Sequence, residues 1–380
     1  MIPQNNPLAN YLHHQAEINE AVHRVLRSGR YILSEETSRF EEEFAAFTGT
    51  KYAVGTGSGT EALHLALRAL GIGPGDEVMT VSNTAVATVA AIEMTGAKPI
   101  FVDIHPLSYT LNPDLLQENL TARTKAVIPV HLYGQPSELD PILAFAEKHD
   151  LYVVEDCAQS HGARYRGKRT GAWGHVGAFS FYPTKNLGCL GDGGAVTTHD
   201  DTIYRRVLEL RQYGWDRARI SRVPGFNSRL DELQAAILRV KLEHLEDNNQ
   251  RRIDIARRYT DVLASTPLIL PQPVADTEHV YHQYVVRCPK PMSRDALAGF
   301  LSHLGIQTGV HYPVPVHLQP AYLDRIASPG PLPVTEEICG TILSLPMFPE
   351  LGDHDIHHLL EGILRYTRRG NPAELPERQG

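Results

Sequence analysis

Residues 151–162 read Leu-Tyr-Val-Val-Glu-Asp-Cys-Ala-Gln-Ser-His-Gly, and residues 177–188 read Gly-Ala-Phe-Ser-Phe-Tyr-Pro-Thr-Lys-Asn-Leu-Gly. Each stretch opens with an apolar, strand-like run, and a polar residue closes it: Asp156 in the first and Lys185 in the second. Sheets built from strands and helices in alternation bind ligands beyond the carboxyl ends of their strands. The two stretches therefore predict one site that contains a carboxylate and an amine.

These two groups are the ones that pyridoxal phosphate chemistry requires. A lysine amine forms a Schiff base with the cofactor aldehyde, and a carboxylate pairs with the protonated pyridine nitrogen, which keeps the ring an electron sink. Lys185 lies between an apolar strand and the glycine-rich residues 188–194, a frame that a solvated surface lysine does not need. Taken alone, Asp156 is also compatible with a helix N-cap, and Gln159 with an ordinary polar loop residue.

A glycine-rich turn, Gly-Thr-Gly-Ser-Gly-Thr at residues 55–60, joins a predicted strand to a predicted helix. Glycines let the backbone approach a phosphate, and a helix start offers free N–H groups and a positive dipole end. Ser180 is placed to donate to the same phosphate. The turn is not the GxGxxG fingerprint, and Asp76 precedes the next strand instead of ending it, which disfavours a nicotinamide dinucleotide. A tight turn without a ligand is the alternative interpretation.

The first two thirds of the chain alternate strand-like and helix-like segments, which is typical of a three-layer α/β domain with a mostly parallel sheet. We expect strands at 51–54, 77–81, 99–102, 125–130 and 151–155, and helices at 61–70, 84–95, after Pro113 and from Pro136. A long or broken helix is expected over 231–263.

The proline content rises after Thr266, so we place a domain boundary there. The expected organisation is a large domain with an N-terminal arm at 1–265, a small α+β domain at 266–370 and a frayed tail at 371–380. Within the small domain we expect strands at 283–287 and near 308–312, a helix at 293–303, and a last helix from about Asp355.

The composition argues against several classes of protein. Lys and Arg number 36 against 44 Asp and Glu, with no basic stripe, so we expect no nucleic-acid role. We expect neither a signal peptide nor a membrane span, because no charged and then apolar leader and no run of about 18 apolar residues occurs. The four cysteines form no CxxC pair and indicate reduced thiols in a cytoplasmic protein. We expect no metal, and interpret His354, His357 and His358 as the polar face of a helix.

Several motifs in order resemble the DegT/DnrJ/EryC1/StrS family of pyridoxal-phosphate-dependent sugar aminotransferases. The matching stretches are GTGSGTEALHLAL (55–67), VVEDCAQSHGA (153–163), FSFYPTKNLGCLGDGGAVTT (179–198), GFNSRLDELQAAIL (225–238), HYPVPVHLQPAY (311–322) and LPMFPEL (345–351). The resemblance covers nearly the whole chain and implies fold type I, similar to aspartate aminotransferase.

The resemblance also implies roles for individual residues. Lys185 matches the Schiff-base lysine, Asp156 the partner of the pyridine nitrogen, and Gln159 the residue beside the phenolic oxygen of the cofactor. The phosphate cup is matched by Gly59, Thr60 and Ser180, with Asn227 reaching it from the neighbouring subunit of a homodimer that shares its active sites. The segments that contact the nucleotide sugar contain Arg229, His311, Tyr312 and His317.

The family implies a transfer of the amino group of L-glutamate to a nucleotide-linked keto sugar, with pyridoxamine phosphate as the intermediate form of the cofactor. The form PTKNLGxLGDGGA looks most like members that aminate C3 of a sugar on thymidine diphosphate; amination at C4 and pyridoxamine-dependent dehydration are the alternatives. Relatives with histidine in place of the lysine perform dehydration, so Lys185 favours transamination. Ala85 departs from the flat side chain that often covers the cofactor ring, and Asn83 or a neighbour is the candidate replacement. An oxidoreductase and a non-catalytic regulator that binds the cofactor are the remaining alternatives.

Overall fold

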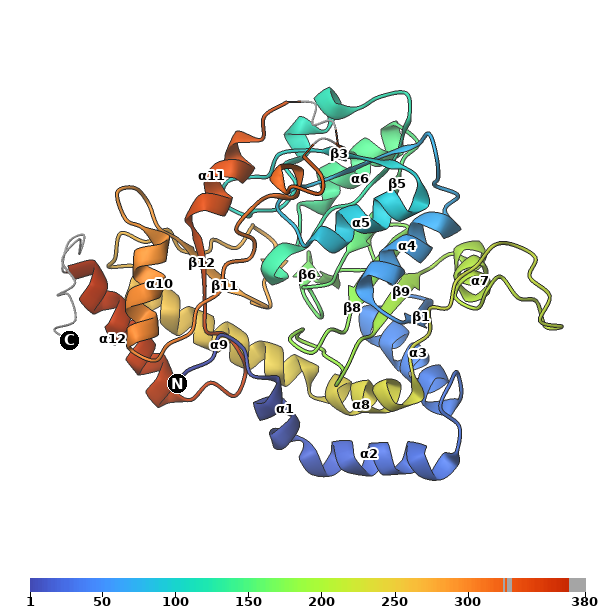
Figure 1. The fold of residues 1–380 in the computed structure, drawn as a ribbon, viewed down its shortest axis with the longest axis horizontal. Coiled ribbons are helices and arrows are strands. Elements are labelled where there is room, and N and C mark those ends of the chain that lie inside the picture. Colours follow the sequence, from blue (N-terminus) through green and yellow to red (C-terminus); the bar gives the residue numbers. More distant parts are fainter. Residues whose placement is uncertain (324, 327–329, 369–380) are drawn as a thin grey trace.

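The computed structural model describes residues 1–323, 325–326 and 330–368, and its centre is a seven-stranded sheet (Figure 1). The strand order is β1-β9-β8-β5-β4-β2-β3, and only the pairs formed by β9 are antiparallel. The strands are β1 (Tyr52–Thr56), β2 (Glu77–Thr80), β3 (Lys98–Phe101), β4 (Thr124–Val127), β5 (Tyr152–Asp156), β8 (Val176–Ser180) and β9 (Gly194–Thr198). Six of the seven strands therefore run in one direction, as the sequence predicts.

Both faces of the sheet are buried, because neighbouring residues of one strand enter different hydrophobic clusters. In β5, Val154 packs with α4 (Gly59–Ala69), α5 (Val86–Thr95) and α7 (Asp201–Leu210), whereas Val153 packs with α6 (Leu139–Lys148). Successive strand residues point to opposite faces, so a strand covered on both sides needs apolar residues throughout. This gives the helix–sheet–helix layers that the sequence pattern predicts.

The N-terminal helices form a part of the fold that the sequence analysis did not predict. They are α1 (Pro7–His13), α2 (Gln15–Ser28) and α3 (Glu35–Thr48), and α2 and α3 pack on α8 (Glu232–Glu243). The expected helix over 231–263 is broken at His244, after which α9 (Leu245–Leu263) begins. Figure 1 shows α1 and α2 beside α8 and α9 along one edge of the molecule.

The C-terminal part has its own hydrophobic cluster around the two-stranded sheet of β11 (Tyr284–Arg287) and β12 (Ile342–Leu345). Its helices are α10 (Arg294–His303), α11 (Pro333–Thr341) and α12 (Asp353–Arg368). The same cluster contains Ile2 and the second half of α9, including Tyr259 and Leu263. The boundary near residue 266 stays a prediction, and the tail at 371–380 lies outside the described residues.

Two expected elements are wrong. The segment after Pro113 forms two short 3-10 helices, η1 (Pro113–Leu115) and η2 (Gln117–Asn119), in place of one α-helix. The expected strand at 308–312 is reduced to one bridge between Gly309 and Ser344. Pro313 follows and cannot donate to a ladder, so pairing does not continue.

The remaining elements are short and connect the layers. They are η3 (Leu132–Gly134), β6 (Arg164–Tyr165), β7 (Lys168–Arg169), β10 (Thr277–Glu278) and η4 (Val316–Leu318). None of the helices in the described part of the chain is long and apolar enough to cross a membrane.

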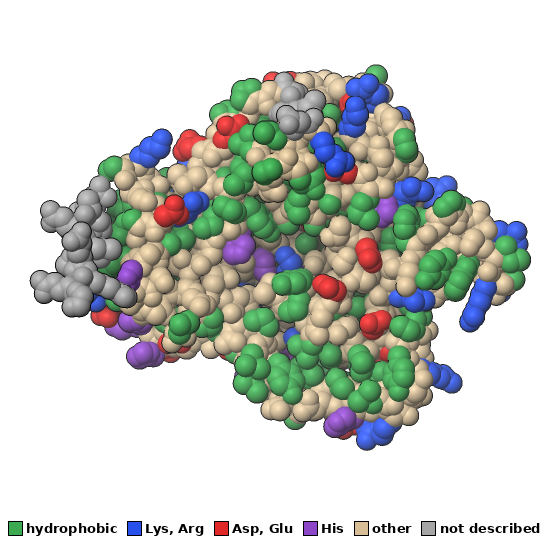
Figure 2. Space-filling model, viewed as in Figure 1, with side chains coloured by type: hydrophobic (Ala, Val, Ile, Leu, Met, Phe, Trp, Pro, Cys, Tyr) green, Lys and Arg blue, Asp and Glu red, His purple; other side chains and the backbone are tan. Residues whose placement is uncertain are grey.

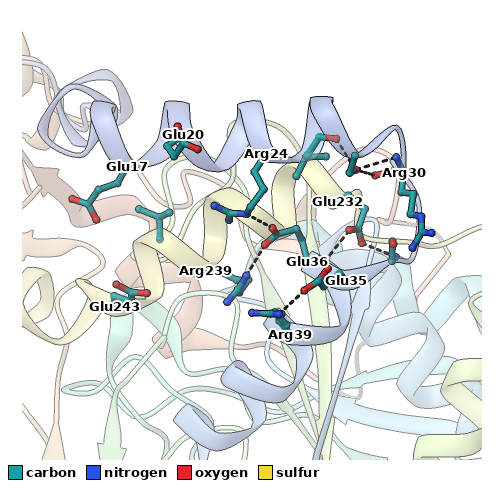
Figure 3. Close-up of a pocket in the computed structure, with 14 residues that line it drawn as sticks. Glu17, Glu20, Arg24, Arg30, Glu35, Glu36, Arg39, Glu232, Arg239 and Glu243 are labelled. Carbon is teal, nitrogen blue, oxygen red and sulfur yellow. Dashed lines mark hydrogen bonds and ion pairs between the residues drawn. The ribbon is translucent and has the colours of Figure 1, made fainter.

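Glu232 joins the start of α8 to the start of α3. Its carboxylate accepts hydrogen bonds from the backbone N–H groups of Ser34 (2.7 Å), Glu36 (3.0 Å) and Thr37 (3.0 Å), and from the Thr37 hydroxyl. Figure 3 shows Glu232 beside the ion pairs that Glu36 makes with Arg24 and Arg239, where α2, α3 and α8 enclose a cavity of about 750 Å³. The helix start has no capping bond from its own N-cap residue, Ser34, so a distant glutamate satisfies these donors.

We expect Glu232→Ala to lower the free energy of unfolding by about 3 kcal/mol, because it leaves several buried donors without an acceptor. Chemical denaturation followed by circular dichroism measures this change. Glu243→Ala, at the exposed other end of α8, is the matched control and should leave the denaturation midpoint unchanged. Equal midpoints for the two variants would contradict the capping role.

Candidate active site

A cavity of about 240 Å³ lies at the carboxyl ends of the parallel strands. The turns after β1, β2, β4, β5 and β8 all contribute to its lining. Ligands of open α/β sheets bind at this edge. The predicted residues that line the cavity are Gly59, Thr60, Asp156, Gln159, Ser180 and Lys185. Figure 2 shows histidine and Lys or Arg side chains together near the middle of the face that is seen in Figure 1.

Asp156 is the last residue of β5 and its side chain is buried. One carboxylate oxygen accepts a hydrogen bond from the Thr88 hydroxyl (2.7 Å), and the other accepts one from the Ala158 N–H (3.1 Å). Burial raises the pKa of Asp156, and these hydrogen bonds and the charge of Lys185 oppose the rise. Asp156 is thus a carboxylate held in a fixed direction at the bottom of the cavity.

Lys185 lies in the turn that follows β8, where its backbone N–H donates to the Tyr182 carbonyl. Desolvation lowers the pKa of the Lys185 amine to about 8, and Asp156 opposes this change. His161, which is buried beside Phe179 and Phe181, stays neutral because burial, with the nearby Lys185 charge, lowers its pKa to about 3. The surroundings therefore give Lys185 a larger fraction of nucleophilic, unprotonated amine than an ordinary lysine has.

The start of α4 forms a tight cradle against the sheet. Ser58 caps the helix by accepting from the Glu61 N–H. A Cβ on Gly59 would lie 2.5 Å from Cβ of Ser180, and a Cβ on Gly194 would lie 2.4 Å from the Ser58 carbonyl oxygen. Only glycine allows these close approaches, which leave the helix start open to the cavity. Free N–H groups and the positive end of the helix dipole suit a phosphate.

Gln159 is fixed from both ends of its amide. Its side-chain oxygen accepts from the Tyr133 N–H (2.7 Å), and its side-chain nitrogen donates to the Tyr312 hydroxyl (3.2 Å). Burial raises the pKa of Tyr312 to about 12, and the Asp156 charge adds to the rise. Tyr312 is therefore brought to the predicted cofactor residues by the C-terminal part of the chain.

The other predicted substrate residues lie in different surroundings. A hydrogen bond of 2.8 Å joins Nδ1 of His311 to the Ser344 hydroxyl. Burial and the charge of Lys185 lower the pKa of His311. His317 is buried, and its ring contacts Ser82 (2.7 Å) and Glu336 (3.4 Å). Arg229 is partly exposed beside the turn at residue 57. Their roles toward a substrate stay predictions.

Asn227 is exposed, at the base of the segment that protrudes between α7 and α8 (Figure 1). Its backbone pairs with Gln212 in an isolated bridge. The described residues that line the cavity do not include it. The predicted contact from a neighbouring subunit also stays a prediction.

His131 and Glu155 form a buried hydrogen-bonded pair beside Asp156 at the end of β5. His131 Nδ1 accepts from the Ser137 N–H, so Nε2 carries the proton that it donates to Glu155 (3.0 Å). Glu155 also accepts from the N–H groups of Gly171, Trp173 and Gly174 (each 2.8 Å). The hydrogen bond from His131 and those backbone donors lower the pKa of Glu155 against the effect of burial. These contacts fix the two loops that flank Asp156.

The sequence analysis missed Thr88, which holds Asp156, and Thr84, whose hydroxyl lies 2.9 Å from that of Thr88. A signal was present, since the two threonines are spaced i, i+4 where the mostly apolar helix α5 begins, Thr84 just before it and Thr88 in its first turn. It also missed Tyr182 and Asp192, which line the cavity. Asn83 is buried and contacts Cys339, whereas Ala85 lines the cavity.

The residues present fit pyridoxal phosphate. The cradle at the start of α4 suits its phosphate, the buried carboxylate of Asp156 suits a protonated ring nitrogen, and the depressed pKa of Lys185 suits bonding to an aldehyde. The three features line one cavity.

Comparison with known proteins agrees with this site. The model of the DegT/DnrJ/EryC1/StrS aminotransferase family matches residues 13–364. The chain is 47% identical over 366 residues to the dTDP-3-amino-3,4,6-trideoxy-alpha-D-glucose transaminase of Streptomyces venezuelae, covering 96% of each protein.

Two solved structures show the same architecture. One is S. venezuelae DesV in complex with a ketimine intermediate, at 46% identity and a TM-score of 0.94, covering 97% of this chain and 99% of that one. The other is NtdA from Bacillus subtilis with bound cofactor PMP, at 31% identity and a TM-score of 0.88, covering 94% and 82%. The predicted fold class, a type I α/β aminotransferase, is confirmed. The chain belongs to the DegT/DnrJ/EryC1/StrS aminotransferase family.

Proposed function

We propose that the protein transfers the amino group of L-glutamate to C3 of a nucleotide-linked keto sugar, a dTDP-3-keto-6-deoxyhexose. The observation that carries this proposal is the single cavity that unites Lys185, Asp156 and the start of α4. The S. venezuelae relative, named as a dTDP-3-amino sugar transaminase, supports the sugar nucleotide and the carbon. Lys185 favours transamination over dehydration.

The proposed cofactor is pyridoxal 5′-phosphate, which supplies an aldehyde for the amine and a ring that accepts electrons. Lys185 would hold the aldehyde carbon and Asp156 the ring nitrogen, with Gln159 beside the phenolic oxygen. The phosphate would lie at Gly59, Thr60 and Ser180. This assignment rests on the residues that line the cavity.

Lys185 is also the group best placed to move protons. With a pKa of about 8, about a tenth of its amine is unprotonated at pH 7. An ordinary lysine at this pH is almost fully protonated, and a general base works best when its pKa is near the working pH. We assign to Lys185 the transfer of a proton from the α-carbon of glutamate.

We further propose a homodimer with shared active sites that acts in the cytoplasm. The exposure of Asn227 on a protruding segment suits a contact with the phosphate in a neighbouring subunit. Arg229, His311, Tyr312 and His317 are the proposed contacts to the nucleotide sugar. Among these, His311 and Tyr312 are close enough to the Lys185–Asp156 pair for its charges to affect their pKa values.

We expect the enzyme to transfer nitrogen from amino-labelled ¹⁵N-L-glutamate to C3 of dTDP-3-keto-6-deoxyglucose. Nuclear magnetic resonance of the product identifies the labelled carbon. The matched 4-keto isomer should yield much less product. Faster turnover of the 4-keto isomer, with label at C4, would replace the C3 assignment with C4 amination, and loss of a sugar oxygen without use of glutamate would indicate a dehydratase.

We expect Asp156→Asn to lower kcat by about 10²-fold while leaving the cofactor-free protein at least as stable at pH 7. Because burial raises the pKa of Asp156 above its unfolded value, its ionisation costs the folded state free energy at pH 7, and asparagine removes this cost. The side-chain oxygen of asparagine can still accept from the Ala158 N–H. Its side-chain NH₂ can donate to the Thr88 hydroxyl, which turns to accept. Steady-state kinetics and thermal unfolding measure the two effects.

Asp261→Asn, at an exposed position of α9, is the matched control and should change neither quantity. A purely structural role for Asp156 would give the opposite result: reduced stability with turnover close to that of the unmodified enzyme.

A further inference from the structure

Two helix breaks meet outside the cavity of the proposed active site. His14 lies between α1 and α2, and His244 lies between α8 and α9. Their rings stack with centroids 4.1 Å apart, and Nε2 of His244 lies 3.1 Å from a carboxylate oxygen of Glu17. Three side chains with metal-binding atoms are thus gathered from the two helix breaks and from α2.

His14 carries an observation that its neighbours do not explain. Its side chain is only 6% exposed, and its Nε2 atom has no hydrogen-bond partner within the described residues. Histidine binds metals through a ring nitrogen that keeps a lone pair. A buried polar nitrogen without a partner costs free energy that a metal ion would recover.

From this geometry we infer that His14, Glu17 and His244 form a binding site for a divalent transition-metal ion of the zinc class. One donor atom from each residue lies within 4.8 Å of the other two. A tetrahedral zinc ion with bonds of about 2.0–2.1 Å places its ligands about 3.3 Å apart. Binding would therefore require the two stacked rings to rotate until their donor atoms reach this spacing, and water would complete the coordination.

The charges and the access to the site agree with a cation. Glu17 supplies one carboxylate, and Glu350, which accepts a hydrogen bond from Asn10 (2.9 Å), also acts on His14 electrostatically. Two nitrogen donors and one carboxylate are ligands that zinc accepts. The Glu17 side chain is 52% exposed, so the ion can enter from solvent. The bound ion would fasten α1 and α2 to the junction of α8 and α9.

Isothermal titration of the tag-free, cofactor-loaded protein with zinc chloride tests this inference. We expect one bound zinc ion per chain with a dissociation constant in the micromolar range or below, and a higher thermal midpoint with zinc. His14→Ala, Glu17→Ala and His244→Ala should each weaken binding by about tenfold or more, because each removes a ligand.

His357→Ala is the matched control and should bind zinc as the unmodified protein does, since His357 is exposed and pairs only with Glu361 among the described residues. If His14→Ala does not fold, zinc binding by His244→Gln tests the site instead. His244 is partly exposed, so its replacement opens no buried cavity. Absence of binding in the unmodified protein, or equal affinity in the folded ligand variants, would overturn the assignment.

Discussion

Asp156 is a buried carboxyl group whose ionisation burial disfavours, and the groups around it in the proposed active site favour its ionised form. The Thr88 hydroxyl and the Ala158 N–H hold its two oxygens, and Lys185 opposes the rise in its pKa. A buried charge needs such partners, since isolated ions in a protein interior neutralise instead. The same carboxylate opposes the fall in the pKa of Lys185. Each residue therefore favours the charged form of the other, against the larger effect of burial.

The packed layers of the fold fix the ends of the strands, and so the positions of Asp156 and Lys185. Loops on both sides of Asp156 are fixed by the His131–Glu155 pair, and α5 delivers Thr88 from the neighbouring layer. The start of α4 approaches β8 and β9 so closely that Gly59 and Gly194 leave no room for a side chain. The C-terminal part then brings Tyr312 to Gln159. A site on the rigid edge of a buried sheet keeps its geometry better than one on free loops.

The sheet, the position of Asp156 at a strand end and the cradle at residues 55–60 could all be predicted from the sequence. The hydrophobic periodicity and the turn residues that indicate them are local signals. The roles of Thr88 and Tyr133 could not be predicted, because they depend on which helix and which loop lie against β5. The strand expected at 308–312 failed because Pro313 ends pairing after one bridge. The N-terminal helices were missed, and one of them depends on a distant residue, since Glu232 caps α3 across the fold.

The central claim is that Lys185 and Asp156 form one cofactor site that reacts with an amino donor. Its most direct test is the visible absorption spectrum of the protein with pyridoxal phosphate, before and after addition of L-glutamate. We expect a visible band from the lysine-bound cofactor, which glutamate converts to the spectrum of pyridoxamine phosphate. Lys185→Ala should lack the band, whereas Lys125→Ala, at an exposed position of β4, should keep it. Absence of the band in the unmodified protein, or an unchanged band in Lys185→Ala, would contradict the account.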